Sequence, residues 1–270
     1  MKEQPVLCFV DFTDTTDNLK LWAAFLHKKT GRPIDLLFVR DNNTPIVLGK
    51  EVDESTIRKK LNRFRSDACI TSGENHIKEG CNCTLISSIA ESKDAIYTMI
   101  PVHKYNDVQF LNGKTVLKML RKSRIPGLII PEINKFTPPK AVSTIANFRQ
   151  TQKITAPWLV HLSKYLDLEI KMYMPAKGEQ QVKHNFSFIR QFCDDHGITP
   201  ETNTSASGIK TDKHILKQLS GNIHLLHLGP QPNFFERLLG EDNDARLVSN
   251  KYGTPVFCVN SRDDLFVPCV

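Results

Sequence analysis

Two copies of one sequence pattern occupy this chain, and the repeat restricts the fold more than any other feature. Residues 12–38 align without a gap with residues 148–174, which is an offset of 136 positions. The matched residues include Phe12 with Phe148, Trp22 with Trp158, Leu26 with Leu162 and Ile34 with Ile170. A repeat of this length indicates two copies of a whole domain rather than a solenoid of short units.

The length of the chain and its prolines suggest where the two copies divide. A chain of 270 residues can form two domains of ordinary size. The adjacent prolines in EINKFTPPK, residues 132–140, interrupt regular structure between the copies. We therefore expect a first domain over residues 1–132, a linker over 133–139 and a second domain over 140–270.

Short apolar runs alternate with amphipathic stretches in both copies, which predicts alternating strands and helices. In the first copy we predict strands at 5–10, 34–39, 70–78, 95–100 and 126–131, and helices at 19–29, 53–66, 83–92 and 113–123. In the second copy we predict strands at 144–148, 169–174, near Ile198, 223–228 and 255–259, and helices ending at Tyr165 and spanning 182–195, 212–219 and 245–250. This order predicts a doubly wound α/β fold with parallel strands.

One proline modifies the second copy. Pro157 stands where the first copy has Leu21. Because proline lacks a backbone N–H and is tolerated best at the start of a helix, we expect that helix to start near Ala156, with Thr155 as its cap.

Composition argues against several classes of protein. The net charge of +7 is spread along the chain, so we expect a solvated basic surface and no nucleic acid partner. No segment approaches the roughly 20 apolar residues of a membrane span, and the first residues lack the apolar run of a secretion signal, so we expect a cytoplasmic protein. The seven cysteines form no C-x-x-C pair, and Cys81-Asn82-Cys83 is a poor zinc signature. We expect no bound metal.

The letters GKT at residues 113–115 raise the question of a phosphate-binding P-loop. That motif requires glycine five residues before its Gly-Lys pair, because successive backbone N–H groups wrap the phosphates. The required position holds Val108, and residues 104–111 contain no glycine. Gly113 therefore does not belong to a P-loop.

The order of elements and three motifs together resemble the universal stress protein family, as a tandem pair that covers nearly the whole chain. The motifs are VDFTDTTDNLKLWAAFLHKKTG, HIKEGCNCTLISSIAESKDAIYTM and GKTVLKMLRKSRIPGLIIP. The resemblance implies two parallel five-stranded sheets related by a pseudo-twofold axis. It also implies that the last strands, PGLIIP and PVFCV, pair with one another, which would cover two apolar edges.

Nucleotide-binding members of that family carry G-x-x-G-x9-G-[ST] between the fourth strand and the last helix. Mapped here, the resemblance assigns a cofactor site to these first-copy residues: Asp11, Val39, Gly113, Lys114 and Thr115. Lys114 stands where Ser or Thr is usual. The other two glycine positions hold Ile100 and His103, and Pro101 removes a further N–H. We expect ATP or AMP to bind weakly in this domain or not at all.

The second copy departs further from the pattern. The residues at the mapped positions are Asn147 in place of Asp11, Gly229, and Gly240, which comes two positions early. Pro230 and Pro232 stiffen the loop, and the acidic run at 241–244 would repel a phosphate from the helix N-terminus. We interpret these residues as a vestigial site.

The resemblance and the departures together predict a non-enzymatic stress-response protein that acts in binding or signalling. Its protein partner is unknown, and it has weakened or lost ATP binding. The alternative is a first domain that binds adenine nucleotide and slowly hydrolyses ATP. No nucleophile or carboxylate stands in a sequence relation to His103, so we expect no catalytic residue.

Overall fold

The computed structural model describes residues 3–13, 16–40, 52–103, 111–131, 136–145, 152–175, 180–205, 221–228 and 253–260. The first half contains β1 (Val6–Phe9), α1 (Thr16–Thr30), β2 (Ile34–Arg40), α2 (Glu54–Asp67), β3 (Asn75–Glu79), α3 (Asn82–Ser92), β4 (Tyr97–Val102), α4 (Gly113–Leu120) and β5 (Gly127–Pro131). The second half contains β6 (Ala141–Ile145), α5 (Gln152–Leu166), β7 (Glu169–Pro175), α6 (Gln180–Asp195), β8 (Glu201–Ser205), β9 (Ile223–Leu228) and β10 (Val256–Asn260).

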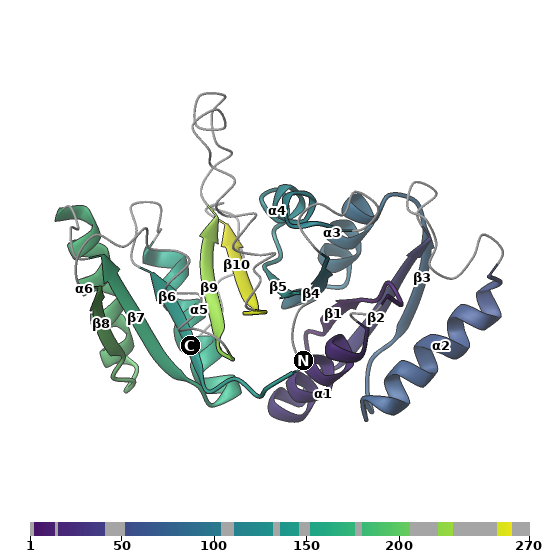
Figure 1. The fold of residues 1–270 in the computed structure, drawn as a ribbon, viewed down its shortest axis with the longest axis horizontal. Coiled ribbons are helices and arrows are strands. Elements are labelled where there is room, and N and C mark those ends of the chain that lie inside the picture. The colour runs from purple at the N-terminus through teal and green to yellow at the C-terminus, as the bar shows by residue number, and fades with distance from the viewer. Residues whose placement is uncertain are drawn as a thin grey trace.

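These strands form one ten-stranded sheet (Figure 1) in the order β3-β2-β1-β4-β5-β10-β9-β6-β7-β8. Neighbouring strands within each half are parallel, and β5 and β10 pair antiparallel where the halves meet. The order is the same when counted outward from this junction in either direction. The predicted α/β fold is confirmed: two five-stranded parallel units are related by a pseudo-twofold axis and joined through their last strands.

Helices cover both faces of the sheet. One apolar core lies between one face and α1, α2, α5 and α6, and the other lies between the opposite face and α3 and α4. Because both faces are covered, several strands are buried along their whole length, including β1, β4, β5, β9 and β10. This explains why the sequence shows continuous apolar runs rather than strict alternation. Within the described residues, no helix is long and apolar enough to cross a bilayer.

The predicted start of α5 is wrong. The helix begins at Gln152, so Pro157 lies within it and Thr155 is not its cap. Proline there removes one intrahelical hydrogen bond, but α5 buries Ile154, Trp158 and Leu159 in the core. This apolar burial outweighs the local cost, so the helix extends N-terminal to the proline. The Thr155 hydroxyl is buried and has no hydrogen-bond partner among the described residues.

Two predicted strand positions in the second half also shift. The strand expected at 144–148 is β6, Ala141–Ile145, and the strand expected near Ile198 is β8, Glu201–Ser205. Ser143 and Thr144 lie buried in β6 because their hydroxyls donate to the Ile223 and Leu225 carbonyls at 3.2 and 3.4 Å. Hydrophobic patterning does not reveal a strand that buries satisfied hydroxyl groups. The helices predicted at 212–219 and 245–250 lie outside the described residues.

Aromatic side chains fill the junction between the halves. The ring of Phe257 in β10 lies 5.5 Å from Tyr97 of β4 and 5.0 Å from Trp158 of α5, measured between centroids. Phe136, between β5 and β6, packs edge-on against Trp22 of α1 at 5.2 Å. Both repeated tryptophans are core residues, and the contact between Tyr97 and Phe257 joins the two halves of the chain.

A polar contact also crosses the junction. Asn260, at the end of β10, is 5% exposed, and its Nδ2 donates to the Leu120 and Ser123 carbonyls at 2.9 and 2.6 Å. These carbonyls lie at the C-terminal end of α4, where helix carbonyls have no intrahelical partner. A side chain of the second half thus caps a helix of the first.

We predict that Asn260→Ala destabilises the protein by about 1–3 kcal/mol, because it leaves two buried carbonyl oxygens without this donor. Urea denaturation would measure the change in the free energy of unfolding. Asn203→Ala is a matched control, since Asn203 Nδ2 bonds only at the surface, to Glu201 Oε1 at 3.0 Å. Equal effects of the two substitutions would contradict the capping role.

The second half also buries neutral histidines. Burial lowers the pKa of His161, His224 and His227 to about 4 from the ordinary 6.5. His224 contacts the Ser143 hydroxyl at 3.3 Å, whereas neither ring nitrogen of His227 has a hydrogen-bond partner among the described residues. Their positions in β9, three residues apart, place these two side chains on opposite faces of the sheet.

These histidines predict a loss of stability in mild acid. Below the ordinary pKa of 6.5 the unfolded chain takes up protons, whereas the buried rings stay neutral down to about pH 4. The free energy of unfolding should therefore fall as the pH is lowered from 6.5 to 4, by up to about 1.4 kcal/mol per pH unit for each histidine. Urea denaturation at several pH values would measure this slope. His227→Leu should flatten it, and exposed His184→Gln should not; an unchanged slope in His227→Leu would refute the prediction.

Candidate functional site

The candidate site lies at the carboxyl ends of β1 and β4 in the first half. The chain runs outward from β1 through β2 to β3 and then returns to place β4 on the other side of β1. Parallel α/β sheets bind ligands at such a reversal of strand order, where the connecting loops diverge and leave a crevice. Asp11 follows β1 and His103 follows β4, so both lie at this position.

The Asp11 carboxylate is already fully engaged by the protein. Its Oδ2 lies 2.7 Å from His103 Nε2, and its Oδ1 accepts from the Thr13 backbone N–H at 3.2 Å and from the Thr13 hydroxyl at 2.8 Å. The side chains of Asp11 and His103 are only 14% and 5% exposed. The group that the family resemblance assigns to adenosine therefore binds His103 and Thr13 instead.

The structure gives His103 a carboxylate partner that no relation within the sequence indicated. Asp11 is its partner although the two residues are 92 positions apart. Parallel pairing of β1 with β4 brings their carboxyl ends together, and no local sequence signal carries that information. The Asp11-x-Thr13 spacing, by contrast, is a recognisable turn in which a carboxylate bonds the backbone two residues on.

This cluster does not have the geometry of a proton relay from hydroxyl to histidine to carboxylate. The Thr13 hydroxyl lies 3.3 Å from His103 Nε2, the same ring nitrogen that contacts Asp11. In a relay, the histidine uses one nitrogen for the nucleophile and the other for the carboxylate. The arrangement is instead that of a histidine and a threonine that hold one carboxylate.

At the N-terminus of α4, hydrogen-bond donors are likewise bonded within the protein. Asn112 Oδ1 accepts from both the backbone N–H and the hydroxyl of Thr115, at 3.0 and 3.1 Å. Gly113 is buried and Lys114 is exposed. The two donors that Thr115 would offer to a phosphate therefore bond the helix cap. An asparagine directly before a helix is a recognisable capping signal, so the sequence contained a cue for Asn112.

Strand β4 also differs from the mapped phosphate loop. Ile100 and Pro101 lie inside β4 and pair with Ile129 and Ile130 of β5, so they are sheet residues rather than loop residues. The His103 backbone N–H donates to the Leu111 carbonyl at 3.1 Å, which ties the end of β4 to the segment that precedes α4. This bond holds the His103 backbone beside the start of that helix.

Of the remaining residues that the family resemblance maps to a nucleotide site, only one lies within the described part of the chain. Val39 is buried in β2, opposite Lys78 of β3. Asn147, Gly229 and Gly240 of the second copy lie outside the described residues. The structure thus brings Asp11 and His103 together at the end of the sheet, and it places Gly113, Lys114 and Thr115 in the first turn of α4.

Solved structures with the same architecture cover almost the whole chain. A universal stress protein from Archaeoglobus fulgidus DSM 4304 is 14% identical, with a TM-score of 0.65 and coverage of 96% of this chain and 97% of its own. A functionally unknown protein from Pseudomonas aeruginosa PAO1 is 11% identical, with a TM-score of 0.63 and coverage of 97% and 94%. A third solved structure, from P. aeruginosa UCBPP-PA14, is 11% identical, with a TM-score of 0.60 and coverage of 96% and 93%.

No model of a known protein family matches the sequence, and no curated protein matches it. The similarity to known proteins is therefore a similarity of three-dimensional structure. It shows that this chain has the fold of a tandem universal stress protein, which the resemblance in its sequence predicts.

We predict that Asn112→Ala lowers the free energy of unfolding by about 1 kcal/mol, because the first turn of α4 loses its cap. Thermal denaturation would measure the change. Asn112→Asp is the matched control, since aspartate also caps helices well, and it should retain most of the stability. A larger loss in Asn112→Asp than in Asn112→Ala would contradict the capping role.

Proposed function

We propose that this chain is a non-enzymatic tandem universal stress protein of the cytoplasm, which works through protein contacts and has weakened or lost ATP binding. The observation that supports this proposal is the engagement of Asp11 by His103 and Thr13. A nucleotide that used Asp11 would have to displace a buried histidine first. The cap on α4 adds a second internal competitor, because it occupies the donors of Thr115.

The free energies of these hydrogen bonds are large enough to weaken nucleotide binding substantially. Hydrogen bonds that involve a charged group are worth about 1.5–3 kcal/mol each. Loss of one such bond from His103 to Asp11 reduces nucleotide affinity by roughly tenfold to a hundredfold, and the opening of the helix cap reduces it further. A site that starts in the micromolar range would then fall near the millimolar range.

The alternative is an adenine-nucleotide site in the first half, with slow ATP hydrolysis. It is favoured by the position of Asp11 at the reversal of strand order and by exposed Lys114 in the first turn of α4. This function requires His103 to rotate away from Asp11. The two functions therefore differ in what removal of the His103 side chain does to binding.

Isothermal titration of the full chain with ATP and with AMP tests both functions. For the unmodified protein we expect no saturation below about 1 mM nucleotide, which corresponds to a binding free energy weaker than about −4 kcal/mol. His103→Gly restores a glycine at the mapped position and frees Asp11 Oδ2. It should therefore strengthen binding by at least about tenfold.

Two further variants make the result specific. The double variant Asp11→Asn with His103→Gly should lose the gain, because the freed acceptor is no longer charged. Exposed His184→Gly is the matched control and should bind like the unmodified protein. Micromolar binding by the unmodified protein would overturn the proposal in favour of the alternative, which a phosphate-release assay would then examine. No gain in His103→Gly would show that His103 is not the block.

A further inference from the structure

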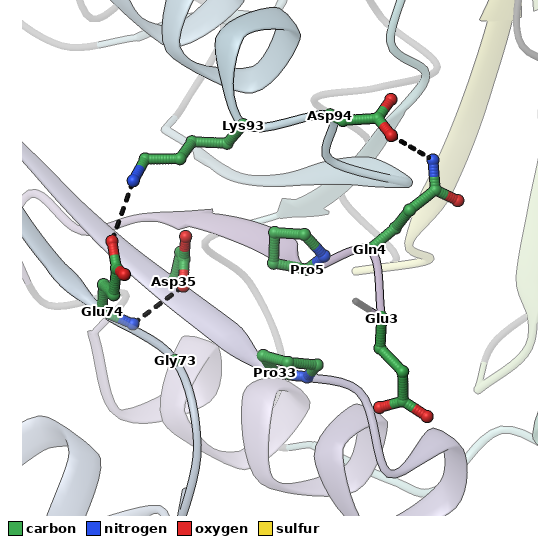
Figure 2. A pocket seen from close by; sticks show the side chains of 9 residues that line it. All are labelled: Glu3, Gln4, Pro5, Pro33, Asp35, Gly73, Glu74, Lys93 and Asp94. Carbon is green, nitrogen blue, oxygen red and sulfur yellow. Dashed lines mark hydrogen bonds and ion pairs between the residues drawn. The ribbon is translucent and has the colours of Figure 1, made fainter. Parts of the chain in front are cut away.

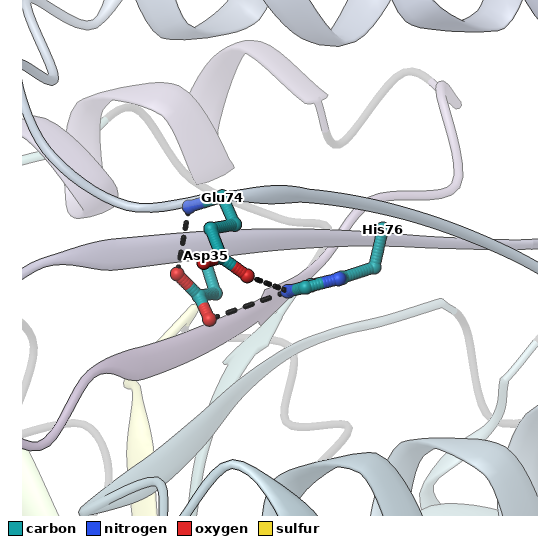
Figure 3. Close-up of side chains that lie close together, drawn as sticks. All are labelled: Asp35, Glu74 and His76. Atoms are coloured by element: carbon teal, nitrogen blue, oxygen red, sulfur yellow. Dashed lines mark hydrogen bonds and ion pairs between the residues drawn. The ribbon is translucent and has the colours of Figure 1, made fainter.

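A second group of titratable side chains lies at the opposite end of the same half-sheet, where the strands begin. Asp35 is the second residue of β2, Glu74 directly precedes β3 and His76 is the second residue of β3. Figure 3 shows that the His76 ring points to the space between the two carboxylates. One ligand atom from each of the three lies within 4.8 Å of the other two.

The distances within this group suit coordination of a cation. His76 Nε2 lies 3.3 Å from Asp35 Oδ2 and 3.8 Å from Glu74 Oε2. Ligand atoms bound tetrahedrally to zinc at about 2.0–2.1 Å are separated from one another by about 3.3 Å. The hydrogen-bonded pair of His103 and Asp11 is much shorter, at 2.7 Å. The Asp35–His76 separation is thus long for a strong hydrogen bond and close to the edge of a zinc tetrahedron.

The backbone fixes two of the three ligands relative to each other. The Glu74 N–H donates to Asp35 Oδ1 at 2.8 Å, which leaves Asp35 Oδ2 directed at His76. Gly73 has a φ of +115°, and a Cβ at that position would lie 2.1 Å from the Ile34 carbonyl oxygen. Only glycine allows this approach, so the segment that carries Glu74 is held against the start of β2.

A pocket of about 380 Å³ opens beside the group and supplies room for a further ligand. Asp35 and Glu74 line it together with Glu3, Lys93 and Asp94 (Figure 2). Four acidic residues and a single lysine therefore line this pocket, and Asp35 is only 4% exposed. The excess negative charge favours a cation there.

Two cationic side chains, Lys93 and Arg65, lie near the group. Lys93 Nζ lies 2.8 Å from Glu74 Oε2, but both side chains are at least one-third exposed, at 36% and 57%, and such surface pairs contribute little. Arg65 donates to the carbonyls of Ser72, Ile34 and Glu74 and to Asn75 Oδ1. Its hydrogen bonds are thus made to backbone and amide oxygens beside the group, not to the carboxylates.

We propose that Asp35, Glu74 and His76 bind a single divalent transition-metal ion of the zinc type, with the fourth position open to the pocket. One imidazole nitrogen and two carboxylate oxygens form a donor set that suits zinc. The expectation of no bound metal rests on the cysteine spacings, which carry no information about Asp35, Glu74 and His76. Pairing of β2 with β3 brings them together.

The test uses the full chain, stripped of metal with a chelator and with accessible thiols alkylated, because Cys69 and Cys81 are exposed and free thiolates compete for zinc. Titration with Zn²⁺ against a coloured competing chelator measures the affinity and stoichiometry. We expect one equivalent to bind at micromolar concentration or below. Titration with Co²⁺ should give visible absorption bands of a nitrogen and oxygen site, without the near-ultraviolet band of a thiolate.

His76→Gln and Glu74→Gln should each weaken Zn²⁺ binding by at least about tenfold, since each removes a ligand. The Glu74 side chain is 57% exposed and that of His76 is 13% exposed, so Glu74→Gln keeps the proposal testable even if Asp35→Asn or His76→Gln disturbs folding. Exposed His184→Gln should bind like the unmodified protein. Absence of saturable binding, a thiolate spectrum, or unchanged affinity in His76→Gln would each overturn the proposal.

Discussion

The antiparallel pairing of β5 with β10 is the interaction on which the rest of the structure depends. Each half is a parallel sheet that ends in an apolar strand, and such an edge exposes unpaired N–H and C=O groups together with hydrophobic side chains. In this chain each edge covers the other, with Leu128 opposite Phe257. The junction also positions Asn260 to cap α4, so the helix of the candidate site depends on the second half.

The polar side chains at the two ends of the first half-sheet differ in how closely they approach one another. At the carboxyl end, His103, Thr13 and Asn112 bond the groups that a nucleotide would use, and the distances are those of short hydrogen bonds. At the amino end, Asp35 and His76 remain further apart beside an acidic pocket. The polar groups at the carboxyl end bond one another, whereas we propose that the groups at the amino end bind a cation.

The elements of the first half follow closely from local sequence. Apolar runs, caps and the repeat predict β1 through β5 and the helices between them, because the residues that form each element are neighbours in the chain. The strand predicted from residue 70 nevertheless begins only at Asn75. The errors in the second half have particular causes. Pro157 stays inside α5 because tertiary burial exceeds a local preference, and β6 contains Ser143 and Thr144, whose hydroxyls bond within the sheet.

The sequence by itself determined the doubled α/β architecture and the loss of the glycine pattern at Ile100 and His103, and its family resemblance implied the pairing of the two last strands. Only the tertiary structure decided that His103 bonds Asp11 and that His76 lies beside Asp35. Secondary structure follows from the periodicity of neighbouring residues. Contacts between side chains, by contrast, depend on which strands pair and in which register, and those pairings join residues separated by most of a domain.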